Sequence, residues 1–356
     1  MQGSRYAFLD GIRGIAAVFV LTRHTIFFSH VPHFRSYLAV DVFFILSGFV
    51  IAGAYEEKLR AGAISALDFI RIRIIRLYPV YFVSFLLCAF LFVRHTYSSK
   101  TYSLEDCAVV LLATAFFLPC RLPPHADLFP LNGPYWSLFF ELVANVSYAV
   151  ARPYLSDALL VFLVALAGSA VAVIGSHYNG LDAGFAWGPG QVAAGLSRSF
   201  FGIFLGVLIF RKRSSLGRLF DGFDVPWLAV LALVAILASP SLGWLNPYID
   251  LACVFFLFPV SLIVASKGVG GRFEETLLYL GSASYPMYVL HSPLGDIADW
   301  LASRMGAASG LLVGIAFIAV MISFSVWLER TYDIPIRRRL TALIRRRQPF
   351  TVQSAS

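Results

Sequence analysis

Ten separate stretches of this sequence are apolar enough, and about long enough, to cross a lipid bilayer as helices. A spanning helix needs about 20 predominantly apolar residues, and hydrophobic residues make up 59% of the 356-residue chain, against 13% for charged residues. So few charges cannot cover a water-facing surface, and 15% of aromatic residues excludes a disordered chain. We therefore predict an all-α polytopic membrane protein, a bundle of about ten transmembrane helices at residues 12–31, 38–54, 78–94, 136–151, 156–175, 195–210, 226–242, 249–265, 277–294 and 310–328.

An eleventh apolar stretch, residues 104–119, decides the topology, because its crossing would reverse the side of every later loop. It is shorter and opens with Glu105 and Asp106. If it does not cross, and the N-terminus is cytoplasmic, 21 lysines and arginines face the cytoplasm and six face outward; if it crosses, the numbers become 10 and 17. Lysine and arginine concentrate in cytoplasmic loops. We therefore expect ten crossings, both termini in the cytoplasm, and a re-entrant or surface-lying segment 104–119 on the outer side.

The sequence shows one domain and no internal repeat. We expect a single transmembrane domain over residues 1–336 and a short basic cytoplasmic tail over 337–356, whose arginines would contact anionic membrane lipids. Arginine-rich cytoplasmic loops account for the net charge of +8, so this charge does not indicate nucleic-acid binding. The four cysteines lack metal-ligand spacing, and we expect them to pack in apolar surroundings without a metal.

Ionisable side chains inside predicted spans are costly, so each is a candidate functional group. Arg13 and His24 share one face of the first predicted helix, because eleven residues at about 100° each return to within about 20° after three turns. They stand about 16 Å apart along the helix axis. For either residue alone, the commoner alternative is an arginine that reaches phosphate headgroups or a histidine hydrogen-bonded within the bundle.

Arg73 and Arg76 lie after the second predicted span, three residues apart and on one helical side. Clustered guanidinium groups suit phosphate, because they offer forked donors and a permanent charge. The alternative is a positive-inside anchor, which composition alone favours. Ser47, Gly48 and Gly53, in the second span, are small enough to allow close helix approach.

Asp41, Glu141 and His291 lie in the outer half of the bundle in the ten-crossing topology, at a depth comparable to that of His24. A carboxylate beside an imidazole fixes its tautomer and stabilises its protonated form. This arrangement is suited to general-base catalysis on a hydroxyl group. The alternative is a set of helix-end groups in contact with water, but their shared depth favours a site with His24.

Five segments carry these residues and occur in order: FLDGIRGIAAVFVLTRH, DVFFILSGF, RIIRLYP, YWSLFFE and SYPMYVLH, over residues 8–291. Together they resemble the motifs of the acyltransferase-3 family of integral membrane acyltransferases. The resemblance implies an acyl-CoA-dependent O-acyltransferase of the bacterial cytoplasmic (inner) membrane. Its donor would be cytoplasmic acetyl-CoA or another acyl-CoA, and its acceptor a hydroxyl of a carbohydrate, commonly a cell-envelope polysaccharide or its lipid-linked precursor. The stretch LVANVSYAV after Glu141 departs from an aromatic Phe-Tyr pair that is frequent in the family.

The resemblance also implies roles for the candidate residues. Arg13 and His24 match the family's essential pair, separated by ten residues. His24, oriented by Asp41 or Glu141, would deprotonate the acceptor hydroxyl or carry the acyl group transiently. The expected catalytic residues are His24, Asp41, Glu141 and His291, with His291 acting as an acceptor-side or structural group, and the expected residues for the coenzyme A phosphates are Arg13, Arg73 and Arg76.

Two other classes of protein fit part of this pattern. A transporter that flips acyl groups or lipid-linked sugars without chemistry would also carry charges inside the membrane. Such transporters are commonly built from inverted repeats with matching broken helices, which this sequence does not show. A purely structural subunit would tolerate replacement of Arg13 and His24 together.

Overall fold

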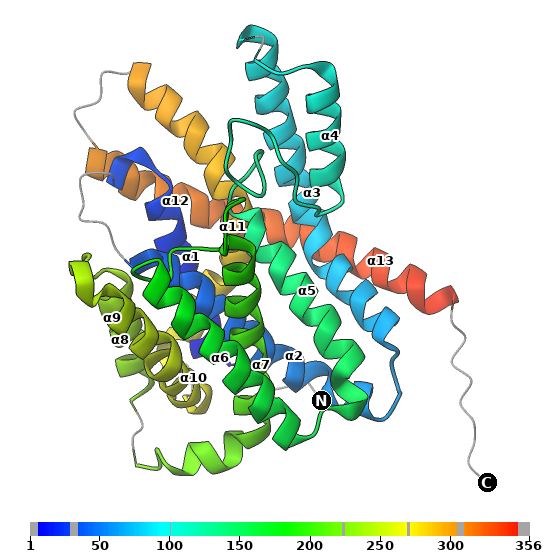
Figure 1. Ribbon diagram of the computed structural model, residues 1–356, viewed down its shortest axis with the longest axis vertical. Helices are drawn as coiled ribbons and strands as arrows, with labels where there is room; N and C mark the ends of the chain where they lie inside the picture. Colours follow the sequence, from blue (N-terminus) through cyan, green and yellow to red (C-terminus); the bar gives the residue numbers. More distant parts are fainter. Residues whose placement is uncertain are drawn as a thin grey trace.

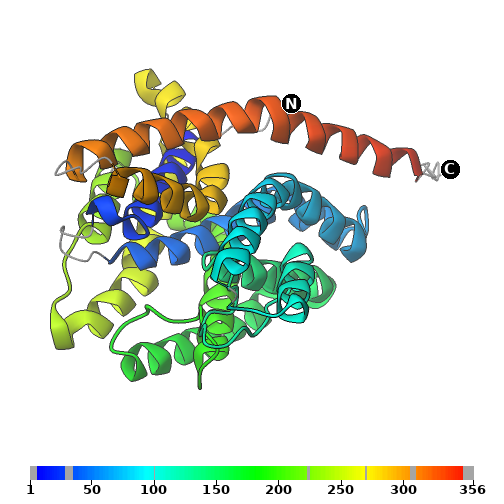
Figure 2. The same ribbon diagram turned by 90° about the horizontal axis from the view of Figure 1, so that it is seen from above.

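The computed structural model describes residues 6–28, 35–99, 101–222, 225–268, 271–304 and 310–347, which fold into an all-helical bundle (Figure 1). Two five-residue π-helices, Cys253–Leu257 and Glu329–Asp333, join α9 (Asn246–Ala252) to α10 (Phe258–Lys267) and α12 (Gly310–Leu328) to α13 (Ile334–Arg347). Figure 2 shows α12 and α13 as one long rod that reaches beyond the rest of the bundle. The α-helices are α1 (Ala7–Arg23), α2 (Ala39–Arg60), α3 (Ala66–Ser99), α4 (Leu104–Ala115), α5 (Tyr135–Ala151), α6 (Asp157–His177), α7 (Gln191–Arg218), α8 (Pro226–Leu237), α9 (Asn246–Ala252), α10 (Phe258–Lys267), α11 (Glu274–Arg304), α12 (Gly310–Leu328) and α13 (Ile334–Arg347).

Six helical segments within the described ranges are long and apolar enough to cross a membrane. They correspond to six of the ten predicted spans, to within two residues at the start of 156–175 and 310–328. The other four predicted spans correspond to α1, α5, α8 and α11: α1 and α5 have 17 residues each, α8 has 12, and α11 is long but more polar. The six segments are Arg35–Arg60, Ala66–Ser99, Asp157–His177, Gln191–Arg218, Gly243–Lys267 and Leu312–Leu343.

The segment predicted to stay on one side forms α4, which packs against the distal part of α3 (Figure 1). Its 12 residues extend about 18 Å, less than the hydrocarbon thickness of about 30 Å. The helix begins with a capping box, in which Ser103 and Asp106 satisfy each other's backbone N–H groups. At the other end of the chain, the predicted tail boundary at residue 337 falls inside α13, and residues 348–356 lie outside the described ranges.

Close contact between α2 and α7 depends on glycine, as predicted for Gly48. A Cβ atom on Gly48 would lie 2.0 Å from the carbonyl oxygen of Ile203, and one on Gly206 would lie 2.1 Å from the carbonyl oxygen of Ile45. The two backbones therefore touch with no side chain between them. This crossing brings the N-terminal half of α2 beside α7, where α7 carries Arg198.

We expect Gly48→Ala to lower the free energy of unfolding by about 1–3 kcal/mol, because the added methyl overpacks a contact between two backbones. Gly133→Ala is the matched control, since nothing lies within 4 Å of a Cβ at that position. Thermal unfolding in detergent measures the stability of the two purified variants against that of the wild type. Equal melting temperatures for the two variants would contradict this account of the helix crossing.

Two prolines, Pro286 and Pro293, lie inside α11. A proline has no N–H for the carbonyl four residues before it, which for Pro293 is that of Val289. That carbonyl instead accepts hydrogen bonds from Ser84 Oγ at 2.5 Å and Asn132 Nδ2 at 3.0 Å. These bonds tie the turn of α11 around Val289 to α3 and to the loop before α5.

Candidate active site

Two cavities open into the bundle, and the two ends of α1 contribute to different ones. The outer cavity, named after the predicted topology, has a volume of about 800 Å³ and is lined by His24 together with Arg23, Arg35, Tyr37, Trp136 and Arg198, among others. The inner cavity has a volume of about 180 Å³ and is lined by Arg13, Arg73, Arg76, Glu141 and Ser284, among others. Arg13 and His24, which were predicted to share one face of the first helix, thus line two different cavities.

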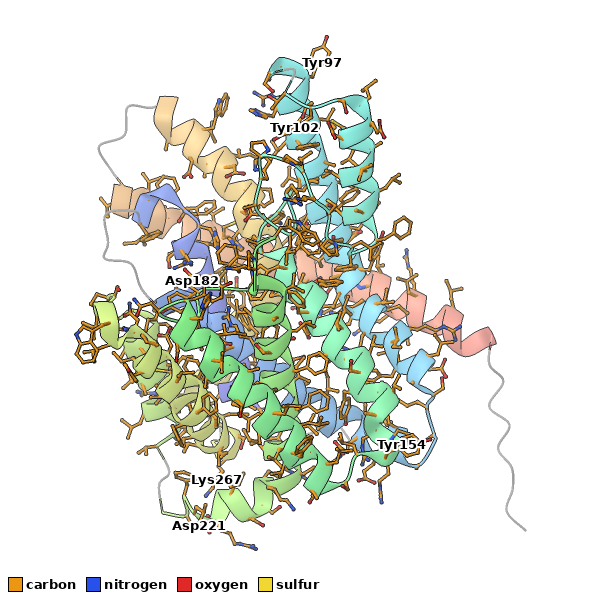
Figure 3. All side chains as sticks on the ribbon, viewed as in Figure 1. Tyr97, Tyr102, Tyr154, Asp182, Asp221 and Lys267 are labelled. Carbon is orange, nitrogen blue, oxygen red and sulfur yellow. The ribbon has the colours of Figure 1, made fainter. Side chains whose placement is uncertain are left out.

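Figure 3 shows where one residue of the outer cavity lies in the molecule. Asp182, which lines the outer cavity, lies well above Lys267 and Asp221 in this view. Lys267 Nζ is 2.7 Å from Asp221 Oδ1, at the end of the bundle where α7 and α10 finish. Arg60 at the end of α2 and Arg213 in α7 belong to one further surface cavity.

Arg13 is held in the inner cavity by α11. Its Nε donates to Ser284 Oγ at 2.9 Å, its Nη2 donates to the Gly281 carbonyl at 3.1 Å, and Nη2 lies 3.2 Å from Asp10 Oδ1. About a third of the side chain stays exposed (32%), so the remaining N–H groups are available to a ligand.

Arg73 forms an ion pair with Glu141, with 2.7 Å between Nη2 and Oε1. Ser47 Oγ donates to the same oxygen at 2.6 Å. Glu141 therefore lines the inner cavity, and its predicted position beside His24 is wrong. The reason is its depth: Glu141 lies six residues, or about 9 Å, into α5, where it meets the first third of α3.

Arg76 contacts the region where α12 passes into α13. Its Nη1 lies 3.5 Å from Asp333 Oδ2, and its guanidinium lies 5.4 Å from the centre of the Tyr285 ring. Asp333 is fully buried and also pairs with Arg337 at 2.9 Å. Since Arg76 shares this carboxylate and remains 27% exposed, it keeps donors for an incoming anion. The structure thus brings the three predicted donor-site arginines to one cavity.

His24 follows the last residue of α1, and its side chain is exposed to the outer cavity. Its neighbour is His291, with 5.1 Å between the ring centres. His291 is fully buried, and its Nδ1 lies 2.7 Å from the Tyr288 carbonyl. A carbonyl only accepts, so Nδ1 carries the proton and Nε2 has a free lone pair in the neutral ring. Nε2 has no hydrogen-bond partner among the described residues.

Asp41 is engaged with Arg198 and does not orient His24. Arg198 Nε lies 3.0 Å from Asp41 Oδ1 and Nη2 lies 2.7 Å from Oδ2, a forked pair with side-chain exposures of only 1% and 2%. Arg198 also donates to the Ala183 and Tyr37 carbonyls and lies 5.3 Å from the Trp136 ring centre. The prediction that Asp41 or Glu141 orients His24 is therefore wrong, because each carboxylate is held by an arginine.

A second buried ion pair closes the other wall of the outer cavity. Arg35 Nε lies 3.0 Å from Asp250 Oδ1, and Tyr37 and the backbone N–H of Leu181 both donate to Asp250 Oδ2. At the rim, Arg23 pairs with Asp182. These bonds fix the loops that surround the cavity.

The sequence reasoning missed Arg198, Asp250 and Asp333, whose ion pairs build the two cavities. Each lies inside or a few residues beyond an apolar stretch: 195–210, 249–265 and 310–328. Their positions in or next to apolar stretches could have identified them from the sequence, because an ionisable group that is removed from water needs a partner of opposite charge. Of the four cysteines predicted to pack in apolar surroundings, Cys88, Cys120 and Cys253 are buried, whereas Cys107 is partly exposed.

The fold is that of a multi-pass membrane protein with two internal cavities, each lined in part by charged side chains. Residues 6–330 match the sequence model of the acyltransferase-3 family, described as an acyltransferase domain. The chain therefore belongs to this family, as its five motifs predicted.

Two curated relatives come from rhizobia. The chain is 41% identical over 174 residues to "Protein 2 in picA locus" of Rhizobium radiobacter, covering 45% of this chain and 90% of the relative. It is 25% identical over 305 residues to "Exopolysaccharide production protein ExoZ" of Rhizobium meliloti (strain 1021), covering 80% of this chain and 82% of the relative. No solved structure matches the chain.

Proposed function

We propose that this protein is an acyl-CoA-dependent O-acyltransferase of the bacterial cytoplasmic membrane. It transfers a short acyl group, acetyl by family resemblance, to a hydroxyl of a cell-envelope polysaccharide or its lipid-linked precursor. The observation that carries the proposal is the pair of cavities: one is lined by three arginines, the other by His24, which lies beside the buried His291, and Val40 and Tyr288 line both. Family membership supports the reaction, and the printed name of the relative ExoZ supports a polysaccharide acceptor.

In this proposal the inner cavity binds the donor. Arg13, Arg73 and Arg76 present guanidinium groups toward one space, and guanidinium is the side chain that best matches phosphate oxygens. The existing ion pairs position these arginines before the donor arrives. The pantetheine arm then extends from the phosphates toward Tyr288, and the thioester reaches the boundary of the outer cavity.

The reaction in this proposal takes place at His24. In direct transfer, His24 takes the proton of the acceptor hydroxyl, whose oxygen attacks the thioester carbonyl. The C–S bond then breaks, and the thiolate of coenzyme A leaves and takes up a proton. In the alternative, a His24 nitrogen attacks the thioester carbonyl first, the C–S bond breaks, and the thiolate of coenzyme A leaves and takes up a proton. The acceptor hydroxyl oxygen then displaces His24 from the acyl carbon, and the hydroxyl proton passes to the released imidazole. Trapping of an acyl-histidine adduct with labelled donor and no acceptor distinguishes the second route.

His291 supports His24 in either route. Its ring centre lies 5.1 Å from that of His24, and its Nε2 has no hydrogen-bond partner among the described residues. In this proposal that free lone pair takes up and returns a proton beside His24. Its Nδ1–H is fixed on the Tyr288 carbonyl, which prevents the ring from turning. We therefore assign His291 as a positioning and proton-sharing residue.

The outer cavity offers the acceptor both polar and aromatic surfaces. Trp136, Tyr178 and Phe185 present rings, while Asn179 and Asp182 present hydrogen-bonding groups. Sugars bind to such walls through their C–H faces and their hydroxyl groups. A volume of about 800 Å³ is within the range of about 300–1,000 Å³ seen for ligand pockets.

The test of this function is thiol release from radiolabelled acetyl-CoA by the purified protein, with a panel of cell-envelope glycans as acceptors. The proposal predicts release that depends on an acceptor and label that appears on the glycan. A transporter without chemistry would move glycan and consume no acyl-CoA. Acceptor-dependent glycan movement without thiol release would therefore overturn the proposal.

We expect Arg76→Gln to raise KM for acyl-CoA about tenfold with little change in kcat, because a hydrogen bond to a charged group contributes about 1.5–3 kcal/mol. Arg60→Gln is the matched control: Arg60 is exposed and pairs with Glu57 away from the inner cavity. Initial rates over a range of acyl-CoA concentrations give both constants. An unchanged KM in Arg76→Gln would remove Arg76 from the donor site.

A further inference from the structure

Val40, in the first turn of α2, and Tyr288, in the middle of α11, are the boundary between the two cavities. Both side chains are buried, and both line the inner and the outer cavity. An acyl group that starts in the inner cavity and ends on a hydroxyl at His24 has to pass these two side chains. This boundary therefore limits the size of the group that is transferred.

Tyr288 is held in place at both ends of its side chain. Its hydroxyl lies 2.5 Å from Ser137 Oγ and donates to the Pro134 carbonyl at 3.1 Å. Its ring meets Phe43 edge to face, with 5.5 Å between ring centres. On the backbone side, the next carbonyl along α11, that of Val289, accepts hydrogen bonds from α3 and from the loop before α5. A ring held in this way cannot turn aside for a longer chain.

Val40 is restricted as well. A β-branched side chain in a helix has one strongly preferred rotamer, and Val40 is 7% exposed. The adjacent residue, Asp41, is fixed by its forked pair with Arg198, so this turn of α2 cannot shift easily. The inner cavity has only about 180 Å³ and offers a longer acyl chain little space to fold back.

We propose that Val40 and Tyr288 form the acyl-size filter of the enzyme: they admit acyl groups of two or three carbons and exclude butyryl and longer chains. The proposal rests on the proposed function and names its donor class. Val40 determines the available space, and Tyr288 is the fixed wall opposite.

The filter is tested with Val40→Ala, which removes two methyl groups from the boundary. One methylene more or less on a substrate in a hydrophobic pocket changes discrimination by about 10–200-fold. We therefore expect the ratio of kcat/KM for butyryl-CoA to that for acetyl-CoA to rise at least about tenfold once the boundary has room for the longer chain. Val42→Ala is the matched control, because Val42 is also buried in α2 but lines neither cavity. A ratio of rate constants does not depend on the fraction of folded protein, so any loss of stability cancels.

The measurement uses acetyl-, propionyl- and butyryl-CoA with one glycan acceptor. We expect the wild-type protein to prefer acetyl-CoA and propionyl-CoA. The ratio of kcat/KM for butyryl-CoA to that for acetyl-CoA should rise in Val40→Ala and stay at the wild-type value in Val42→Ala. Equal rates for acetyl and butyryl in the wild type, or an unchanged ratio in Val40→Ala, would overturn the filter while the acyltransferase stands. Failure of the wild type to release thiol from any of the three donors would instead overturn the proposed function.

Discussion

Replacement of His24 by alanine is expected to reduce kcat for acyl transfer by about 10²–10⁴-fold, the usual contribution of a positioned acid–base group. Binding of coenzyme A is expected to stay the same. The reason is geometric: His24 lines the outer cavity, whereas the three arginines assigned to the donor line the inner one. His24 is also the exposed member of the histidine pair, so it is the one that an acceptor hydroxyl reaches.

His95→Ala is the matched control, because His95 is exposed near the far end of α3 and lines neither cavity. Turnover is followed by label on the glycan, and coenzyme A binding by calorimetry in detergent. Full turnover in His24→Ala would exclude both the general-base and the acyl-carrier role. Loss of coenzyme A binding together with turnover would show that the substitution had disturbed the bundle.

The second large effect concerns stability. Asp41→Asn should lower the free energy of unfolding by about 3–5 kcal/mol, because it leaves Arg198 as a buried and uncompensated charge. Both side chains are almost completely buried. Asp182→Asn serves as the control, since its pair with Arg23 is partly exposed and such pairs contribute about 0–1 kcal/mol.

A double variant, Asp41→Leu with Arg198→Met, separates the two possible roles of Asp41. Replacing a buried ion pair by apolar residues of similar volume is often neutral for stability, so thermal unfolding in detergent should return toward the wild-type temperature. A single Asp41→Asn variant with wild-type stability and no activity would contradict the structural role and support the catalytic role that the sequence motif implied.

The fold was predictable wherever apolar composition determines it. The stretches at 38–54, 78–94, 156–175, 195–210, 249–265 and 310–328 correspond to the six helical segments of membrane length. Length and hydropathy describe α11 less well, because Pro286, Pro293 and His291 interrupt its apolar sequence. The same residues that lower the hydropathy of α11 also contribute to the proposed site: His291 lies beside His24, and Pro293 leaves the Val289 carbonyl free to bind α3 and the loop before α5.

The relative positions of site residues within one helix could be predicted from the sequence, whereas the pairs that they form between helices could not. The relation of Arg13 to His24 follows from helix geometry alone, and the structure places the two residues in the two cavities as that relation requires. The partners of Asp41 and Glu141 depend on which helices lie side by side. Asp41 is 157 residues from Arg198, and Glu141 is 68 residues from Arg73. No local pattern specifies such pairs.

In the predicted topology, the proposed transfer from the inner to the outer cavity would carry an acyl group from one side of the membrane to an acceptor on the other. It is tested most directly in proteoliposomes, with radiolabelled acetyl-CoA in one compartment and the glycan acceptor in the other. The account predicts labelled glycan when donor and acceptor are in opposite compartments, and none when both are confined to the same compartment. Label on the glycan with both reagents on one side only would contradict transfer between an inner and an outer cavity.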